Sequence, residues 1–227
     1  GKWKRVVKNV ELRTYLGLLT GGSVIMAIVL TASGTYHSFF SALGDSFVQA
    51  VAFGSTSGFE IADINVWPTA CKIILLVLLL IGGCGNSTSG SIKVIRFIVY
   101  FKLIIRGIYK RIHPHAIRPI MIQNKPVSAE SASSITVFLM LFFSIYIFSS
   151  LVLSVENQDM ETTLAAALGA ITNNGTGFGN IAGGNFGIFS AFGKLFSAIL
   201  MLAGRLELYA IILLFSRSFW NSDRARS

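Results

Sequence analysis

Long apolar segments alternate with polar loops along most of this chain. Four of them reach or approach the roughly 20 residues that a helix needs to cross a bilayer. Three are continuous, whereas glycine and polar residues at Gly82–Ser91 interrupt the second one. The pattern therefore predicts four membrane spans, at Tyr15–Ser33, Ala70–Tyr109 with its interruption, Ala132–Val155 and Phe189–Phe215.

Two further apolar segments are too short to cross a bilayer. Phe39–Phe53 and Met160–Ile171 both have helix-forming apolar patterns. Each runs into small and polar residues, at Gly54–Glu60 and at Thr172–Asn180. Irregular backbone survives at membrane depth only where protein or a water-filled cavity satisfies its polar groups. We therefore expect two re-entrant helices, each followed by an intramembrane loop. The alternative is a pair of surface amphipathic helices with external loops.

The two halves of the chain repeat the order span, short helix, glycine-rich loop, span. The string TSGF from Thr56 matches GTGF from Gly175 at an offset of 119 residues. A lysine followed ten residues later by glycine recurs as Lys72 and Lys194, at an offset of 122. Each unit crosses twice, so the copies are parallel and would surround an axis along the membrane normal. This predicts an all-α membrane protein with two parallel span–pore-helix–span repeats, at 1–112 and 131–227, joined by a linker at 113–130.

Composition and charge support a membrane protein and assign its sides. Hydrophobic residues make up 53% of the 227 residues and charged residues 13%, about half the charged share of a typical soluble domain. Most lysines and arginines behind the net charge of +9 lie before the first span, at 93–130 or after the fourth span. The positive-inside rule then places both termini and the linker in the cytoplasm, so the charge needs no nucleic-acid partner. The opposite face is acidic and would attract cations.

The glycine-rich loops after the short helices have the composition of a cation filter. Glycine lets consecutive carbonyl groups point the same way, and rings of backbone carbonyls can replace the hydration shell of a cation. The negative C-terminal ends of the preceding helices would favour a cation there. The alternative is a plain external loop. The expected filter residues are Ser55, Thr56, Ser57 and Gly58 in the first unit and Asn174, Gly175, Thr176 and Gly177 in the second.

The interruption in the second span and an arginine in the fourth span suggest a gate. Arg205 lies near the middle of the bilayer, where a cation costs several kcal/mol unless it has a partner or water. The repeat places the interruption at the same depth, so a flexible polar loop and a positive charge would meet in the pore. The alternatives are an arginine bonded to backbone carbonyls and a helix kink without a gating role. The expected gate comprises Gly82, Gly83, Cys84, Gly85, Asn86, Ser87, Thr88, Ser89, Gly90 and Arg205.

Other candidate features indicate no chemistry. Cys71 and Cys84 have no metal-ligand spacing and are expected to be buried thiols. The sequence His113-Pro114-His115 lies in the basic linker with no third ligand nearby, so a metal site is not expected. The pattern of Ile117–Val127 is typical of a short hairpin, suited to docking a soluble partner.

Several strings resemble the TrkH/TrkG/KtrB superfamily of potassium-translocating subunits, and in particular the C-terminal half of its TrkH-type members. They are STSGF (Ser55–Phe59), GGCGNSTSGSIKVIRF (Gly82–Phe97), HPHAIRP (His113–Pro119), TNNGTGFGN (Thr172–Asn180) and GRLELYAIILLFSRSFW (Gly204–Trp220). The resemblance implies a potassium-channel-like pore of four repeats, of which this chain holds two. It implies Gly58 and Gly177 as filter glycines, Gly82–Ser91 as an intramembrane loop and Arg205 as the pore arginine opposite it.

The resemblance also implies a bacterial inner-membrane protein that forms homodimers and works with a cytosolic nucleotide-binding regulator of the TrkA type. It implies potassium as the transported ion and no covalent cofactor. Both filter glycines are intact, which favours potassium, and a less selective pathway for K⁺ and Na⁺ is the alternative. Two filter loops make half a ring, so an N-terminal half or a second copy is expected to complete it. Otherwise the chain is a non-conducting half-module. An enzyme is not expected, because no Ser/His/Asp set, carboxylate pair or nucleotide-binding loop is present.

Overall fold

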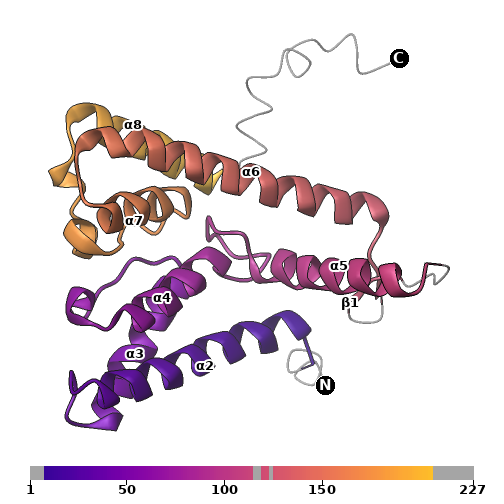
Figure 1. Cartoon of the computed structure of the whole chain (residues 1–227), viewed down its shortest axis with the longest axis horizontal. Helices are drawn as coiled ribbons and strands as arrows, with labels where there is room; N and C mark the ends of the chain where they lie inside the picture. Colours follow the sequence, from indigo (N-terminus) through magenta and orange to yellow (C-terminus); the bar gives the residue numbers. More distant parts are fainter. Residues whose placement is uncertain (1–7, 115–118, 123–124, 207–227) are drawn as a thin grey trace.

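The computed structural model describes residues 8–114, 119–122 and 125–206. In that part of the chain the backbone forms helices, connecting loops and one two-stranded hairpin. Figure 1 shows two stacked groups of helices, with α5 (Val94–Ile112) extending away between them. The lower group comes from the N-terminal half of the chain and the upper group from the C-terminal half. We call the lower group the first unit and the upper group the second unit.

The first unit packs a long helix against two shorter ones. α2 (Val10–Ala32) begins where Asn9 Oδ1 accepts hydrogen bonds from two backbone amides of the first helical turn. The short helix α3 (Phe39–Gly54) lies against α2, and α4 (Thr69–Ile81) packs on both. The connection between α3 and α4 contains one turn of 3-10 helix, η1 (Ile64–Val66).

The second unit repeats this arrangement with α6 (Ala129–Leu153), α7 (Met160–Ile171) and α8 (Ala191–Arg205). Each of these helices begins at a serine or aspartate whose side-chain oxygen accepts a hydrogen bond from an amide of the first turn. In α7 every residue from Ala165 to Ile171 is buried, because its small side chains let the surrounding elements approach closely. The loops of the second unit contain the 3-10 turns η2 (Ser154–Glu156), η3 (Gly179–Gly184) and η4 (Phe186–Ile188).

The short helices lie where the sequence predicts them, and α2 and α6 match the first and third predicted spans. Within the described residues, two helices are long and apolar enough to cross a bilayer, α2 and α6 with its following turn. The second predicted span consists of two helices, α4 ending at Ile81 and α5 beginning at Val94. α5 carries lysine or arginine on most of its turns. α8 ends at Arg205, and the remainder of the fourth predicted span, 207–215, lies outside the described residues.

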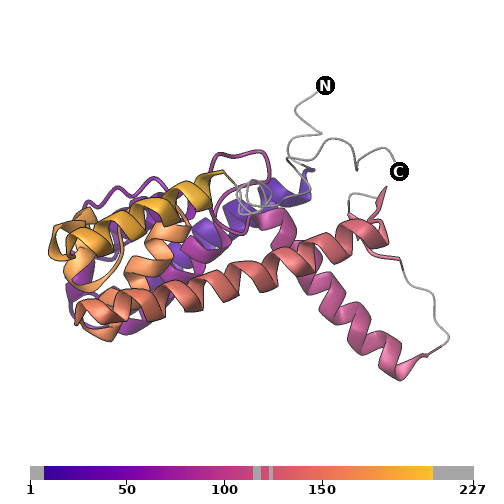
Figure 2. The same ribbon diagram turned by 90° about the horizontal axis from the view of Figure 1, so that it is seen from above.

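The linker forms a small hairpin beside α5. β1 (Met121–Ile122) pairs antiparallel with β2 (Lys125–Pro126), within the region where the sequence predicts a hairpin. Lys102 Nζ donates to the Met121 carbonyl oxygen at 2.6 Å, which fixes β1 on α5. The predicted turn of the hairpin and His115 lie outside the described residues. Figure 2 shows α5 and α6 diverging, so the far half of α5 stands away from the other helices.

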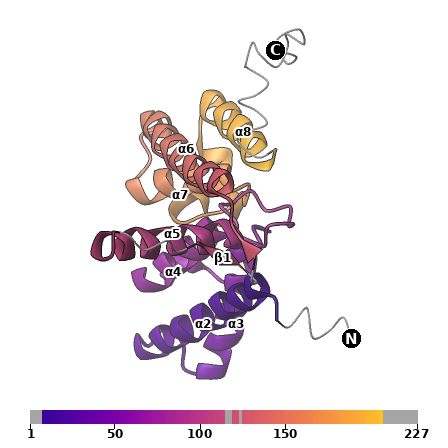
Figure 3. The same ribbon diagram turned by 90° about the vertical axis from the view of Figure 1, so that its right-hand side faces the viewer.

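The two units share one apolar core. Figure 3 shows α2 and α3 at one end of the molecule, α4 and α5 in the middle, and the second unit at the other end. Buried side chains from all three layers form a single cluster. Within it the rings of Phe53 and Phe178 stack, with their centroids 5.7 Å apart. This contact joins the end of α3 to the loop after α7, and so holds the two glycine-rich loops at the junction between the units.

Candidate functional site

The loops after α3 and α7 begin with the same backbone conformation. Three amides after α3 donate to carbonyls of its last turn: Ser55 to Val51, Thr56 to Phe53 and Ser57 to Ala52. Three amides after α7 repeat this pattern: Thr172 to Leu168, Asn173 to Ala170 and Asn174 to Gly169. Left-handed φ angles then alternate in both loops, at Thr56 (56°) and Gly58 (73°) and at Asn173 (55°) and Gly175 (76°). The structural offset between the loops is therefore 117 residues.

This offset corrects the sequence alignment of the two loops. The match at an offset of 119 made Gly177 the counterpart of Gly58, whereas the backbone gives that place to Gly175. Phe59 and Phe178, which the sequence match pairs with each other, also differ in their surroundings. Phe59 is 73% exposed and Phe178 only 4%. The sequence match followed a shared Gly-Phe pair, but the place where each short helix ends decides which residues are equivalent.

The corrected alignment changes the membership of the second loop. Asn174 and Gly175 keep their places, and Thr172 and Asn173 join them as the counterparts of Ser55 and Thr56. Thr176 and Gly177 lie after the segment whose conformation the two loops share, and are not part of it. A Cβ at Gly177 would lie 2.6 Å from Ile181 Cδ1 and 2.9 Å from Ala165 Cβ, so this glycine packs against η3 and α7.

The two loops lie in direct contact. A Cβ at Gly58 would collide with the carbonyl oxygen of Asn174, and the positive φ of Gly58 already disfavours a side chain. Glycine is thus required at this position by both the conformation and the close approach of the neighbouring loop. Backbone carbonyls of the two units are brought to one place without any side chain between them.

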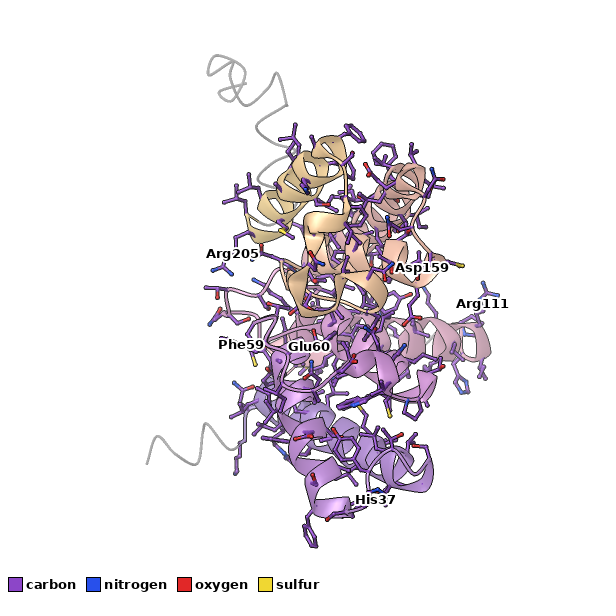
Figure 4. All side chains as sticks on the ribbon, turned by 90° about the vertical axis from the view of Figure 1, so that its left-hand side faces the viewer. His37, Phe59, Glu60, Arg111, Asp159 and Arg205 are labelled. Atoms are coloured by element: carbon purple, nitrogen blue, oxygen red, sulfur yellow. The ribbon has the colours of Figure 1, made fainter. Side chains whose placement is uncertain are left out.

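Polar contacts across the units fix the far ends of these loops. Glu60 Oε2 accepts hydrogen bonds from Thr176 Oγ1 at 3.3 Å and from the Gly183 amide. Asn65 exchanges two hydrogen bonds with the backbone of Gly179, at 2.9 and 3.2 Å. Figure 4 shows Glu60 between the two units. In the sequence, Glu60 counts only among the acidic residues expected to attract cations, and Asn65 has no expected role. The only available signal was the position of a carboxylate directly after the first loop.

Part of the acidic outer surface serves to fix helix ends. Asp159 caps α7 by accepting from the Thr162 hydroxyl at 2.6 Å and the Thr162 amide at 3.0 Å. These hydrogen bonds, the hydroxyl first, lower the pKa of Asp159. Glu156 accepts from the hydroxyl and the amide of Ser190 at 2.6 and 2.8 Å, which fixes the start of α8. The Asp159 carboxylate therefore stays ionised to a lower pH than an ordinary aspartate.

The interruption between α4 and α5 is a side loop with a closed neck. Four backbone carbonyls at the end of α4 and just after it accept hydrogen bonds from the segment that leads into α5. They belong to Leu79, Leu80, Ile81 and Gly83. Their partners are the Ser91 hydroxyl and the amides of Ile92, Lys93 and Val94, at 2.6 to 3.3 Å. The polar groups that a broken helix leaves unpaired are satisfied in this way. Residues 84–90, called the gate loop below, project sideways from this neck.

The gate loop reaches the inner end of the second glycine-rich loop. A Cβ at Gly90 would lie 2.7 Å from the Thr172 carbonyl oxygen and 3.1 Å from that of Gly204, so glycine lets the gate loop pass between α7 and α8. Arg205 then donates through its guanidinium to the Thr88 carbonyl oxygen at 2.5 Å. The structure thus brings together the arginine and the loop that the sequence placed at one depth. Their gating role stays a prediction.

A comparison with models of protein families identifies the family of this chain. Residues 14–223 match the family model described as TrkH, cation transport protein. The chain belongs to the TrkH family. The family is one of membrane transporters and not of enzymes, which confirms the expected class and gives the chain a membrane location.

Curated TrkH-family relatives extend well beyond this chain. The Trk system potassium uptake protein TrkG of Escherichia coli (strain K12) is 32% identical over 223 residues, covering 96% of this chain and 45% of its own length. The Trk system potassium uptake protein TrkH of Salmonella typhimurium (strain LT2) is 30% identical over 213 residues, covering 94% and 44%. The chain therefore spans a little under half the length of the curated relatives it matches.

A solved TrkH structure has the same fold. The crystal structure of the potassium transporter TrkH from Vibrio parahaemolyticus superposes with a TM-score of 0.85 at 24% sequence identity. The match covers 94% of this chain and 46% of that one. The helical fold expected from the sequence is thereby confirmed.

Proposed function

We propose that this chain supplies two neighbouring quarters of a potassium-selective filter. The quarters are Ser55–Gly58 and Thr172–Gly175, with Thr176 and Gly177 supporting the second from behind. The observation that carries the proposal is the shared alternation of left-handed φ angles in two loops that touch through Gly58 and the Asn174 carbonyl. Such alternation turns successive carbonyls toward one side, where they can replace the hydration shell of a potassium ion. The curated relatives named for potassium uptake support potassium as the ion.

The short helices supply the electrostatics for this filter. α3 and α7 both end at the first residue of their glycine-rich loop, so the negative ends of both helix dipoles lie beside the carbonyls. A dehydrated cation is favoured there, and an anion is excluded. In the proposed mechanism potassium passes down its electrochemical gradient, and the filter residues contribute backbone oxygens instead of side-chain ligands.

The gate loop and Arg205 close the path on the inner side of the filter. The gate loop contacts the Thr172 carbonyl, at the first residue of the second quarter, and Arg205 holds the loop through Thr88. A guanidinium near the path repels cations, and its bond to a backbone carbonyl lowers the cost of placing it in the membrane. Opening then requires the gate loop to leave Thr172 and the arginine to release Thr88.

Two quarters must be completed by two more. The side chains of Ser55, Ser57 and Phe59 are exposed, so the first quarter has an uncovered side on which further units can close the ring. An N-terminal half with two similar units, or a second copy of this chain, would fill it. We further propose a homodimer of complete pores in the bacterial inner membrane, with both termini in the cytoplasm and a TrkA-like nucleotide-binding regulator on that side. The basic residues of α5 and of the linker support this orientation.

Rubidium uptake into liposomes tests the filter. Flux through the purified chain alone, blocked by potassium and not by larger organic cations, would support a ring of two copies. Flux that appears only after an N-terminal half is added would support a half-pore. If neither preparation conducts while the chain remains folded, the chain is a non-conducting module and the proposal is wrong.

A further inference from the structure

A carboxylate of α2 also holds the gate loop, at a different residue from the one that Arg205 contacts. Glu11, in the first turn of α2, accepts a hydrogen bond from the Gly85 amide. The two residues lie 74 positions apart in the sequence, so only the packing of the first unit brings them together. The contact lies outside the filter and the arginine, and the proposed mechanism does not use it.

A lysine holds the same residue from its other side. Lys93 Nζ donates to the Gly85 carbonyl oxygen at 3.1 Å, and Lys93 is only 8% exposed. Lys93 also lies in the neck of the loop, where its amide caps the Ile81 carbonyl. The amide and the carbonyl of Gly85 are therefore each bound by a charged side chain, and such hydrogen bonds are roughly twice as strong as neutral ones.

The gate loop is thus tethered at two points by three elements. Gly85 is bound by Glu11 of α2 and by Lys93 at the start of α5, and Thr88 is bound by Arg205 of α8. Breaking the arginine contact alone leaves Gly85 fixed. Freeing the whole loop requires the start of α2 to move away from it as well.

We propose that Glu11 and Lys93 are positioning residues that hold the gate loop closed, and that Glu11 couples the loop to the first turn of α2. The proposal rests on the proposed function, because it adds a control point to the proposed gate. A shift of the N-terminal end of α2 withdraws the acceptor from Gly85 and loosens the loop. Force applied at this end of the first span is thereby passed to the gate without contact with the filter.

The alternative role for Glu11 is stabilisation of the α2 dipole, and the chain offers a matched control for it. Glu130 is the acidic residue in the first turn of α6, the counterpart of α2 in the second unit. An acidic residue near a helix N-terminus stabilises the helix dipole whether or not it touches a loop. Glu130→Ala therefore reproduces the loss of the helix-dipole interaction without the loss of the tether.

Cys84, next to Gly85 and partly exposed, reports release of the loop directly. We would replace the buried Cys71 by alanine and measure the alkylation rate of Cys84 by a small water-soluble maleimide in liposomes. Loss of one charge-assisted hydrogen bond predicts a rate about tenfold higher for Glu11→Ala and for Lys93→Met. Glu11→Gln, which keeps an acceptor, should give an intermediate rate, and Glu130→Ala should match the parent.

Comparing Glu11→Ala with Lys93→Met distinguishes release of the gate loop from a change in the ionisation of the Cys84 thiol. Removing the negative charge of Glu11 favours the Cys84 thiolate, whereas removing the positive charge of Lys93 disfavours it. Rates that rise in both variants support the tether. Rates that move in opposite directions, or that rise equally in Glu130→Ala, overturn it. The assay needs no ion flux, so failure of the proposed filter and failure of the tether are seen in different measurements.

Discussion

Gly58 and Gly175 occupy equivalent places in the two loops but have different surroundings. Both have φ angles near +75°, a conformation that costs a residue with a side chain roughly 1–2 kcal/mol. A Cβ at Gly58 would also collide with the Asn174 carbonyl, whereas nothing described lies within 4 Å of a Cβ at Gly175. Identical substitutions at these positions therefore test different things.

We expect Gly58→Ala to impair selectivity more than Gly175→Ala. The first change displaces the Asn174 carbonyl of the neighbouring quarter, while the second adds only local backbone strain. The measurement is the ratio of rubidium to sodium flux through the completed pore in liposomes. Gly107→Ala, a glycine of α5 with open space around it, serves as the control. Equal losses in the two filter variants would argue against contact between neighbouring quarters.

Arg205 should act as a barrier and not as a structural residue. Removing its guanidinium frees the Thr88 carbonyl and removes the positive charge near the path, so Arg205→Ala should raise cation flux several-fold at unchanged expression. Deletion of residues 85–89 should do the same. Lys194→Ala removes a cation from the other end of α8 and should leave flux unchanged. Unaltered flux in both the arginine variant and the loop deletion would contradict the gate.

At the scale of elements, α7 depends on its N-terminal cap. This helix has only twelve residues, too few to be stable by itself in water. Asp159 caps its first turn, and Asn180 reaches back from the loop after the glycine-rich segment to donate to Asp159 Oδ1 at 3.3 Å. The two ends of the re-entrant segment are therefore fixed to each other at the outer surface.

Asp159→Ala should lower the free energy of unfolding by about 1 kcal/mol at neutral pH, the usual value of such a cap. The pKa of Asp159 is lowered in the folded state. Its charge-dependent stabilisation is thus fully present above the unfolded pKa, about 3.9, and is lost as pH falls through the folded pKa.

Thermal unfolding in detergent between pH 7 and pH 3 measures the effect of this cap. The difference in stability between wild type and Asp159→Ala should shrink in acid. Asp159→Asn keeps the cap but lacks the titrating group, so its stability relative to Asp159→Ala should vary little with pH. A gap between wild type and Asp159→Ala that widens on acidification would contradict the assigned sign.

At the scale of the whole molecule, the two units are joined at two places, by Glu60 and Asn65 and by the gate loop. Both connections run between residues more than 100 positions apart. Figure 4 shows Phe59 and Arg205 at the same margin of the molecule, the side on which the first quarter is uncovered. The proposed ion path, its gate and the surface for further units therefore share one face.

Asn65→Ala should loosen the junction made by Glu60 and Asn65 without unfolding either unit. It removes both hydrogen bonds to Gly179, and each is worth about 1 kcal/mol. Hydrogen exchange of the Gly179 amide should rise about tenfold or more. Asn185→Ala breaks only a bond within its own loop, to the Gly187 amide, and should leave Gly179 protected. Equal protection of Gly179 in both variants would show that Asn65 does not join the units.

The local features of this protein follow from its amino-acid pattern. Apolar periodicity and segment length gave the two short helices, and glycine with polar residues marked the loops after them and the break after Ile81. These features depend on hydrogen bonds within a few residues, which the local sequence controls. The family strings then identified the class, and the offset of 122 between Lys72 and Lys194 fits α4 and α8, which begin at Thr69 and Ala191.

Which residues meet depends on how the helices pack in three dimensions. The Gly-Phe pair suggested Gly177 as the partner of Gly58, but the hydrogen bonds that end each helix give that place to Gly175. Contacts of Glu11 with Gly85 and of Glu60 with the second unit have no local signal, because a carboxylate can satisfy itself equally well in solvent. The packing of helices far apart in the chain selects those partners, and so decides how the filter loops and the gate loop are held.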